Sequence, residues 1–192
     1  MSGAQFRLRT RLRLAAAIAL AIALLGGLLG LLVYTGVYDI GADAPHSEPV
    51  AWVIAATRDR SIAVRANAIV VPRDLNNPLR IAKGAGLYAE MCSECHLAPG
   101  MKRTEISQGL YPPAPVLSDT PARPPQEQFW IIKHGVKLTA MAAWGRTHSD
   151  DLIWDLVGFT QNLPSLSPEQ YSALVKSAPA DHEAMMRDAV GQ

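Results

Sequence analysis

The chain has 192 residues, of which 49% are hydrophobic, 18% charged and 6% aromatic. The charged share lies below the roughly 25% of an average soluble domain, which argues against a disordered chain. Four of the 18 basic residues precede the first apolar segment and all 17 acidic residues follow it, so the body of the chain is mildly acidic. A nucleic-acid-binding protein would carry a basic patch, and we therefore expect no nucleic-acid partner.

An uncharged segment near the N-terminus is long enough to cross a membrane. Its most apolar part, residues 14–33, would span roughly 30 Å as a helix, which is the thickness of a hydrocarbon core. We therefore predict a transmembrane anchor over residues 14–36. Arginines precede this segment and Asp39 follows it, so the positive-inside rule places residues 1–13 in the cytoplasm and the body outside.

A cleaved signal peptide is the alternative to an anchor. Signal sequences usually have a shorter apolar region, of about 7–15 residues. A small-residue triplet does occur at Ala42-Asp43-Ala44, but Pro45 would follow the cut, and proline there commonly blocks cleavage. We therefore expect an uncleaved anchor, and both interpretations export the body of the chain.

The segment that follows the anchor, residues 37–78, is predicted to be a linker that contains a helix over about residues 52–70. The residues expected on one face of this helix are Trp52, Ala56, Ala63, Ala66 and Val70. Because this face is mostly alanine, it would anchor poorly in a membrane. We expect it to rest on the domain that follows.

The remaining periodicity predicts helices and loops, with no convincing pair of strands. Helices are expected over residues 81–91, 125–134 and 150–163. Four prolines make residues 100–123 a predicted loop, and a second loop is expected over residues 136–146. Residues 167–192 are expected to form a C-terminal tail with one short helix. The predicted fold class is all-α.

The run Cys92-Ser93-Glu94-Cys95-His96 is the most informative part of the sequence. Two thiols one helical turn apart can add to the two vinyl groups of a haem, and the adjacent histidine can then bind its iron. A zinc site normally takes four ligands, and the chain has no second cysteine pair. A thioredoxin-like redox pair or a structural disulfide would use the same two sulfur atoms. The pattern favours one covalently attached haem c.

Residues 79–166 resemble the class I cytochromes c, in particular the small membrane-anchored bacterial ones. The residues that match the family's helix signature are Gly84, Tyr88, Cys92, Leu156 and Phe159. In the family the first and last helices cross at these positions, where a glycine permits close approach and aromatic rings fill the crossing. The resemblance therefore implies a class I cytochrome c fold.

The resemblance also implies a second axial iron ligand, Met141, opposite His96. The stretch from Lys137 to Trp144 is similar to the family's Thr-x-Met-Pro-x-Trp signature, with Ala142 at the usual proline position. Other side chains that could take this place are Met101, His134 and His148.

Two more residues match family positions beside the haem. Pro115 begins a Pro-x-Leu pair whose proline carbonyl accepts the Nδ1 proton of the axial histidine in the family, which fixes the ring orientation. Trp144 resembles an indole that lies near a haem propionate, and a plain core aromatic is an equally good interpretation.

The function implied by the resemblance is one-electron transfer rather than catalysis. The expected protein is a single-pass protein of the bacterial inner membrane, with its haem domain in the periplasm. It would serve a respiratory chain, with an oxidase, a reductase or a dehydrogenase as redox partner. One alternative is a ligand sensor or a catalytic haem domain in which Met141 leaves the iron, and another is a haem subunit of a larger respiratory complex.

Overall fold

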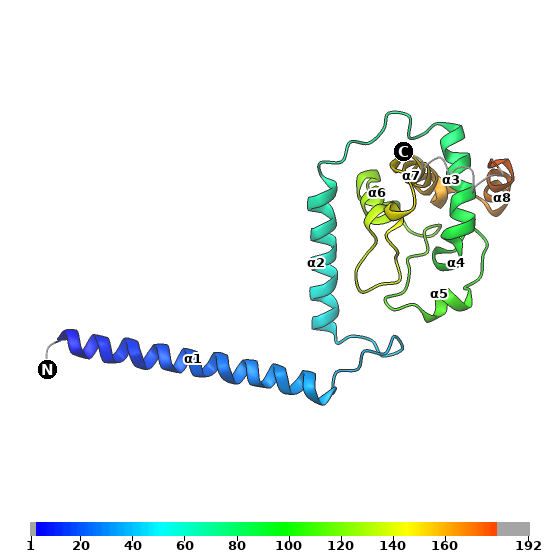
Figure 1. Ribbon diagram of the computed structural model, residues 1–192. Coiled ribbons are helices and arrows are strands. Elements are labelled where there is room, and N and C mark those ends of the chain that lie inside the picture. The colour runs from blue at the N-terminus through cyan, green and yellow to red at the C-terminus, as the bar shows by residue number, and fades with distance from the viewer. Residues whose placement is uncertain (1–2, 180–192) are drawn as a thin grey trace. The chain divides into compact units, whose positions relative to one another are not determined.

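The computed structural model describes residues 3–179, and within this range it contains helices and loops but no strand. The chain divides into two compact units, Met1–Ala44 and Pro45–Gln192. The all-α fold class is thereby confirmed. The helices of ten or more residues are α1 (Gly3–Thr35), α2 (Glu48–Ala66), α3 (Pro78–Met91), α6 (Pro125–His134), α7 (Asp150–Asn162) and α8 (Pro168–Ser177) (Figure 1).

Helix α1 makes up most of the first unit. Its stretch from Arg7 to Thr35 is long and apolar enough to cross a membrane, and none of it is buried within the protein. The exposed leucines and isoleucines along it would be costly to leave in water. The helix therefore fits the membrane anchor predicted over residues 14–36.

Helices α3 and α7 cross at the centre of the second unit. A Cβ atom placed on Gly84 of α3 would lie 2.0 Å from the carbonyl oxygen of Asp155 and 2.8 Å from Cβ of Phe159. Beside this contact, the rings of Tyr88 of α3 and Phe159 of α7 pack with their centroids 5.2 Å apart, and both side chains are fully buried. The crossing expected from the sequence is confirmed, and its closeness requires glycine at position 84.

The ends of these helices follow local signals. Asn77 accepts a hydrogen bond from the backbone of Leu79 at 2.9 Å and precedes a proline at the first position of α3. Ser149 caps α7, and Asp150 follows in its first turn. Helix α6 has the predicted bounds, because it begins with a proline and ends at Gly135, where φ is +66°.

A second group of buried side chains joins α6 to α7. Phe129 of α6 and Trp154 of α7 stack with ring centroids 4.2 Å apart. Ile153 and Val157 are fully buried beside them, and Leu75 reaches the same cluster from the linker. The linker is therefore part of the core of the second unit.

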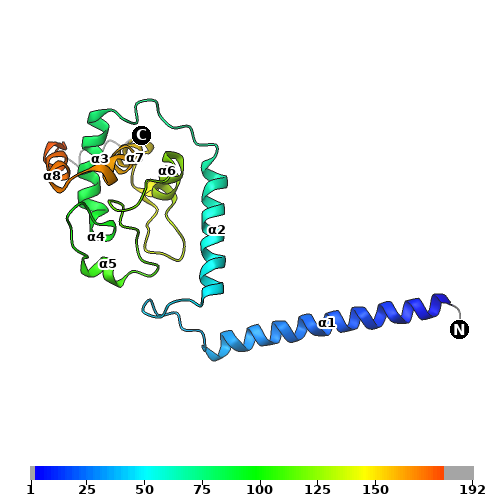
Figure 2. The same cartoon turned by 180° about the vertical axis from the view of Figure 1, so that it is seen from behind.

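Helix α2 packs against α6, as expected, but its buried face matches the predicted one only in part. Ala66 is buried as predicted, and Ile62, which was not assigned to that face, is buried too. Trp52 is instead 71% exposed, and Val70 lies beyond the helix and is 85% exposed. The prediction was wrong at Trp52 and Val70 because alanines give a weak periodic signal. A single large side chain, Ile62, determines which face is buried. Figure 2 shows α2 from the other side, beside α6.

Short elements interrupt the two predicted loops. Residues 100–123 contain α5 (Glu105–Gly109), and residues 136–146 end in the 3-10 turn η1 (Trp144–Arg146). A second 3-10 turn, η2 (Leu163–Ser165), joins α7 to α8, and α8 packs against α3. The predicted short helix of the C-terminal tail is α8. Residues 180–192 of that tail lie outside the described residues.

Arg80 of α3 holds three carboxylates at the edge of the crossing. Its Nη1 lies 2.7 Å from Asp155, while its Nη2 lies 3.0 Å from Asp74 and 3.8 Å from Asp151. Asp155 is 5% exposed, and its burial raises its pKa to about 6. The positive charges of Arg80 and Lys83 offset this burial only in part.

We expect Asp155 to give the free energy of unfolding a distinctive pH dependence. The pKa of Asp155 is about 6 in the folded protein, against an ordinary value of 3.8 in the unfolded chain, so between these two values the folded state binds the extra proton. The Asp155 contribution to stability is therefore largest at low pH and is lost as the pH rises towards 6. The free energy of unfolding can be measured for the full chain and for Asp155→Asn by urea unfolding followed by circular dichroism. The difference in this free energy between the two proteins should shrink from about pH 4 to about pH 6. A constant difference between the two proteins would contradict the raised pKa.

Candidate haem site

The two cysteines lie where α3 passes into the short helix α4 (Ser93–His96). The backbone N–H of Cys92 donates to Tyr88 at 3.0 Å, and the N–H groups of Cys95 and His96 both donate to the carbonyl of Cys92, at 3.2 and 2.9 Å. The two thiols are therefore one helical turn apart, with Cys92 at the cap between α3 and α4 and Cys95 within α4. The histidine is fixed in the same turn.

The buried surroundings of Cys92 argue against a redox-active pair. Both cysteines are present as free thiols. Burial, and to a smaller extent the charge of the neighbouring Cys95, raises the pKa of the Cys92 thiol to about 12. The thiol therefore stays protonated at neutral pH. A thiol–disulfide oxidoreductase needs the opposite shift, because the thiolate is the reactive form.

The ring of His96 is oriented by the backbone of the following loop. Its Nδ1 lies 2.9 Å from the carbonyl oxygen of Pro115, and the N–H of Leu117 donates to the carbonyl of His96 at 3.2 Å. A carbonyl can only accept, so Nδ1 carries the proton and Nε2 keeps its lone pair. Burial lowers the pKa of His96, with the Pro115 contact opposing this, so the ring is neutral at pH 7. A neutral imidazole with Nε2 free of a proton is the form that binds a metal.

The backbone just after His96 is fixed onto α3. Leu97 has a φ of +58°, and its carbonyl accepts a hydrogen bond of 2.5 Å from the hydroxyl of Tyr88. Tyr88 therefore fills the helix crossing with its ring and fixes the end of α4 with its hydroxyl. Sequence reasoning gave this tyrosine only the first of these two roles.

The loop that carries Met141 closes on itself. The N–H of Val136 donates to the carbonyl of Met141 at 3.1 Å, while the hydroxyl of Thr139 donates to Val136 at 2.7 Å and accepts from the N–H of Met141 at 3.0 Å. A Cβ on Gly135 would lie 2.6 Å from the carbonyl oxygen of Met141, so only glycine fits there. These contacts order the loop without a proline at position 142. Sequence reasoning assigned no role to Thr139.

Trp144 is half-buried in η1, where its ring meets the buried ring of His148 edge-on at 5.3 Å. The other sulfur candidate, Met101, lies after α4 and is 38% exposed. His134 is exposed at the end of α6 and packs against Trp130 with ring centroids 4.9 Å apart.

One contact reaches the Pro115 loop from the far end of the linker. The hydroxyl of Tyr111 accepts a hydrogen bond of 2.8 Å from the backbone N–H of His46, and the two rings meet edge-on at 5.2 Å. The partners are 65 residues apart, and no local sequence signal indicates such a pair. The contact fixes the start of the second unit to the loop that orients His96.

The residue types and the Cys92–His96 turn fit a haem of the c type. The two free thiols lie one helical turn apart, and the adjacent His96 is a neutral imidazole whose Nδ1 is oriented by the Pro115 carbonyl. Met141, which the sequence predicts as the second ligand, carries its thioether on the closed loop after α6. A cluster suited to zinc is not found, because residues 3–179 contain no group of three or more His, Cys, Asp or Glu side chains arranged around one point.

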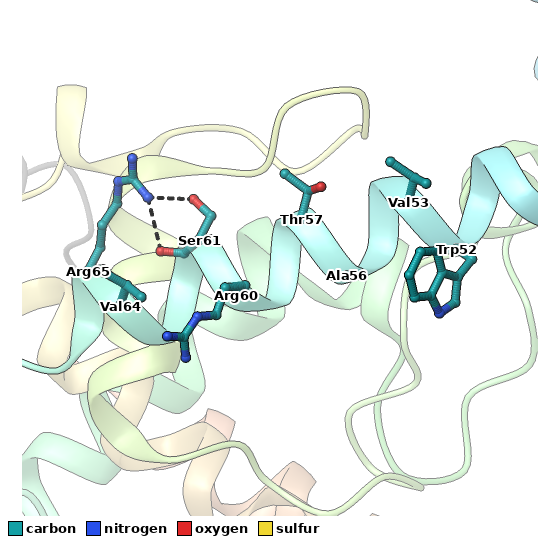
Figure 3. Close-up of a pocket in the computed structure, with 8 residues that line it drawn as sticks. All are labelled: Trp52, Val53, Ala56, Thr57, Arg60, Ser61, Val64 and Arg65. Carbon is teal, nitrogen blue, oxygen red and sulfur yellow. Dashed lines mark hydrogen bonds between the residues drawn. The ribbon is translucent and has the colours of Figure 1, made fainter.

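The exposed face of α2 carries a shallow depression. All eight side chains that line it belong to this one helix, and Figure 3 shows them spread along its open side, with Arg65 bonded to Ser61. A single convex helix cannot enclose a macrocycle. This surface is therefore no candidate for the haem.

The comparison with known families agrees with this chemistry. Residues 79–159 match the family model described as cytochrome c oxidase, cbb3-type, subunit III. No curated protein and no solved structure gives a match to the chain. The matched segment runs from the start of α3, through the Cys92–His96 turn, to Phe159 of α7. Residues 79–159 are thus a class I c-type cytochrome domain, which binds haem for electron transfer, in a chain whose N-terminal apolar helix fits membrane anchoring.

Proposed function

We propose that the protein is a membrane-tethered electron carrier with one haem c, held covalently by Cys92 and Cys95 and ligated by His96 and Met141. The observation that carries this proposal is the fixed turn from Cys92 to His96, in which Nδ1 of His96 points to the Pro115 carbonyl at 2.9 Å. When bound, the haem supplies an iron atom that can hold or release one electron.

The protein's own residues would keep the iron surroundings constant during transfer. Pro115 orients the His96 ring, since the ring proton has a single acceptor in this loop. The bonds among Val136, Thr139 and Met141 hold the sulfur ligand on a closed loop. Two fixed ligands reduce the rearrangement that a change of charge would cause, and a thioether ligand raises the potential above that of a bis-histidine site.

The surroundings of the four candidate side chains support Met141 as the second iron ligand. Met101 is partly exposed, and His134 lies at the surface against Trp130. His148 is buried against Trp144. Met141 sits on a loop in which both its backbone N–H and its carbonyl are hydrogen-bonded, to Thr139 and to Val136.

The proposed setting is the periplasmic face of a bacterial inner membrane. Arg7, Arg9, Arg11 and Arg13 precede the apolar helix and Asp39 follows it, which favours a cytoplasmic N-terminus. The match to a cbb3-type oxidase subunit supports a respiratory partner in the same membrane, such as an oxidase, a reductase or a dehydrogenase. An anchor raises the effective concentration of the carrier near such partners.

The test of this proposal is covalent attachment at the two thiols. Full-length protein made with a c-type maturation system should keep its colour after denaturation and gain the mass of one haem. The double variant Cys92→Ala/Cys95→Ala should lose its haem to acid–acetone extraction, because no other cysteine exists in the chain. Wild-type protein whose colour is extracted by acid–acetone would overturn the proposal.

A further inference from the structure

Helix α8 lies beyond the segment that matches the cytochrome family, yet it packs against the core of the second unit. It begins with a capping box, in which Ser167 accepts from the N–H of Gln170 and the side chain of Gln170 accepts from the N–H of Ser167. Tyr171, Leu174 and Val175 pack on the cluster that contains Tyr88 and has Cys92 at its edge. The helix is therefore a fixed part of the surroundings of the cysteine.

Two glycines allow both ends of α8 to approach closely. A Cβ on Gly100, in the turn after α4, would lie 3.0 Å from Cγ of Pro168 at the start of α8. A Cβ on Gly86 of α3 would lie 2.8 Å from Cβ of Ala178 just beyond the other end. The helix thus extends from the segment that follows His96 to the middle of α3, and it packs along α3.

Tyr171 is the aromatic residue of α8 that packs on this part of the core. Its ring lies 6.1 Å from that of Phe159 and is half-buried. Tyr171 and Cys92 pack against the same buried cluster, which contains Tyr88. Burial raises the pKa of Tyr171, and the Cys92 sulfur adds to this shift. An aromatic ring in this position occupies space that water would otherwise take.

We propose that α8 is a cover over the Cys92 end of the haem attachment, and that Tyr171 is a positioning residue that sets the redox potential by excluding water. This inference rests on the proposed attachment of haem at Cys92. Oxidation adds one positive charge, and a drier environment disfavours the more highly charged state. An intact cover therefore favours the reduced protein and raises the potential.

The test is a redox titration of full-length protein in detergent, carried out on Tyr171→Ala, Tyr171→Phe and Ser172→Ala. At the midpoint potential of the wild type, Tyr171→Ala should shift the ratio of oxidised to reduced protein about threefold towards oxidised, or about 28 mV. Tyr171→Phe keeps the ring and should behave as the wild type does. Ser172 is exposed on the same helix, and its replacement should change nothing.

The outcomes separate a redox role from a purely structural one. A Tyr171→Ala variant with a lower melting temperature and an unchanged potential would overturn the proposal. So would a Tyr171→Phe variant that shifts as much as Tyr171→Ala, since the hydroxyl would then be responsible. If Tyr171→Ala does not retain its haem, Leu174→Ala serves instead, because it removes another side chain of the cover. This variant should shift the redox potential in the same direction. An unchanged potential in Leu174→Ala would also overturn the proposal. Failure of the proposed function is distinct, because the wild type would then carry no covalent haem to titrate.

Discussion

Replacing Met141 by alanine should abolish the weak sulfur-to-iron absorption band of the ferric protein. The same change should lower the redox potential and let carbon monoxide bind the ferrous iron, because it opens one coordination position. Haem should stay attached, since Cys92, Cys95 and His96 remain. Optical spectra of both oxidation states, with and without carbon monoxide, measure all of these effects.

The matched control for this experiment is Met101→Ala. Met101 is 38% exposed, and its replacement should leave the spectrum and the potential unchanged. The assignment is contradicted if Met141→Ala keeps the sulfur band while a variant of Met101, His134 or His148 loses the native spectrum. If the wild type itself lacks the band and binds carbon monoxide freely, a ligand sensor or a catalytic haem domain replaces the electron carrier.

Replacing Gly84 by alanine should destabilise the second unit by about 3 kcal/mol or more, or prevent its folding. The added Cβ would lie 2.0 Å from the carbonyl oxygen and 2.6 Å from the carbonyl carbon of Asp155, and neither atom can move unless α7 moves. Because α7 packs through fully buried side chains such as Phe159, its displacement would open the core. The midpoint of urea unfolding, followed by circular dichroism, measures the loss.

Gly109 in α5 provides the control for the glycine experiment. A Cβ there would meet no atom within 4 Å. Alanine at this position should therefore be neutral or stabilise the protein by up to about 1 kcal/mol, through its better helix propensity. Equal unfolding midpoints for Gly84→Ala and wild type would show that the α3–α7 contact is looser than the structure has it.

The sequence alone determined the features of this protein that depend on local chemistry. The bounds of α6 follow from a proline at its start and a glycine at its end. The apolar helix before Asp39 follows from the absence of charge, and the haem motif follows from residue types at fixed spacing in Cys92 to His96. Each of these signals is complete within a few residues.

The tertiary structure alone decided which distant residues meet. The buried face of α2 depends on Ile62 fitting against α6, so the alanine pattern that pointed to Trp52 was misleading. The contact of His46 with Tyr111 joins residues 65 positions apart, and the packing of α8 on α3 joins segments about 90 residues apart. Such contacts depend on shape and burial in the assembled core. A local pattern carries no information about a partner that far along the chain, and for this reason the cover formed by α8 became visible only in the folded protein.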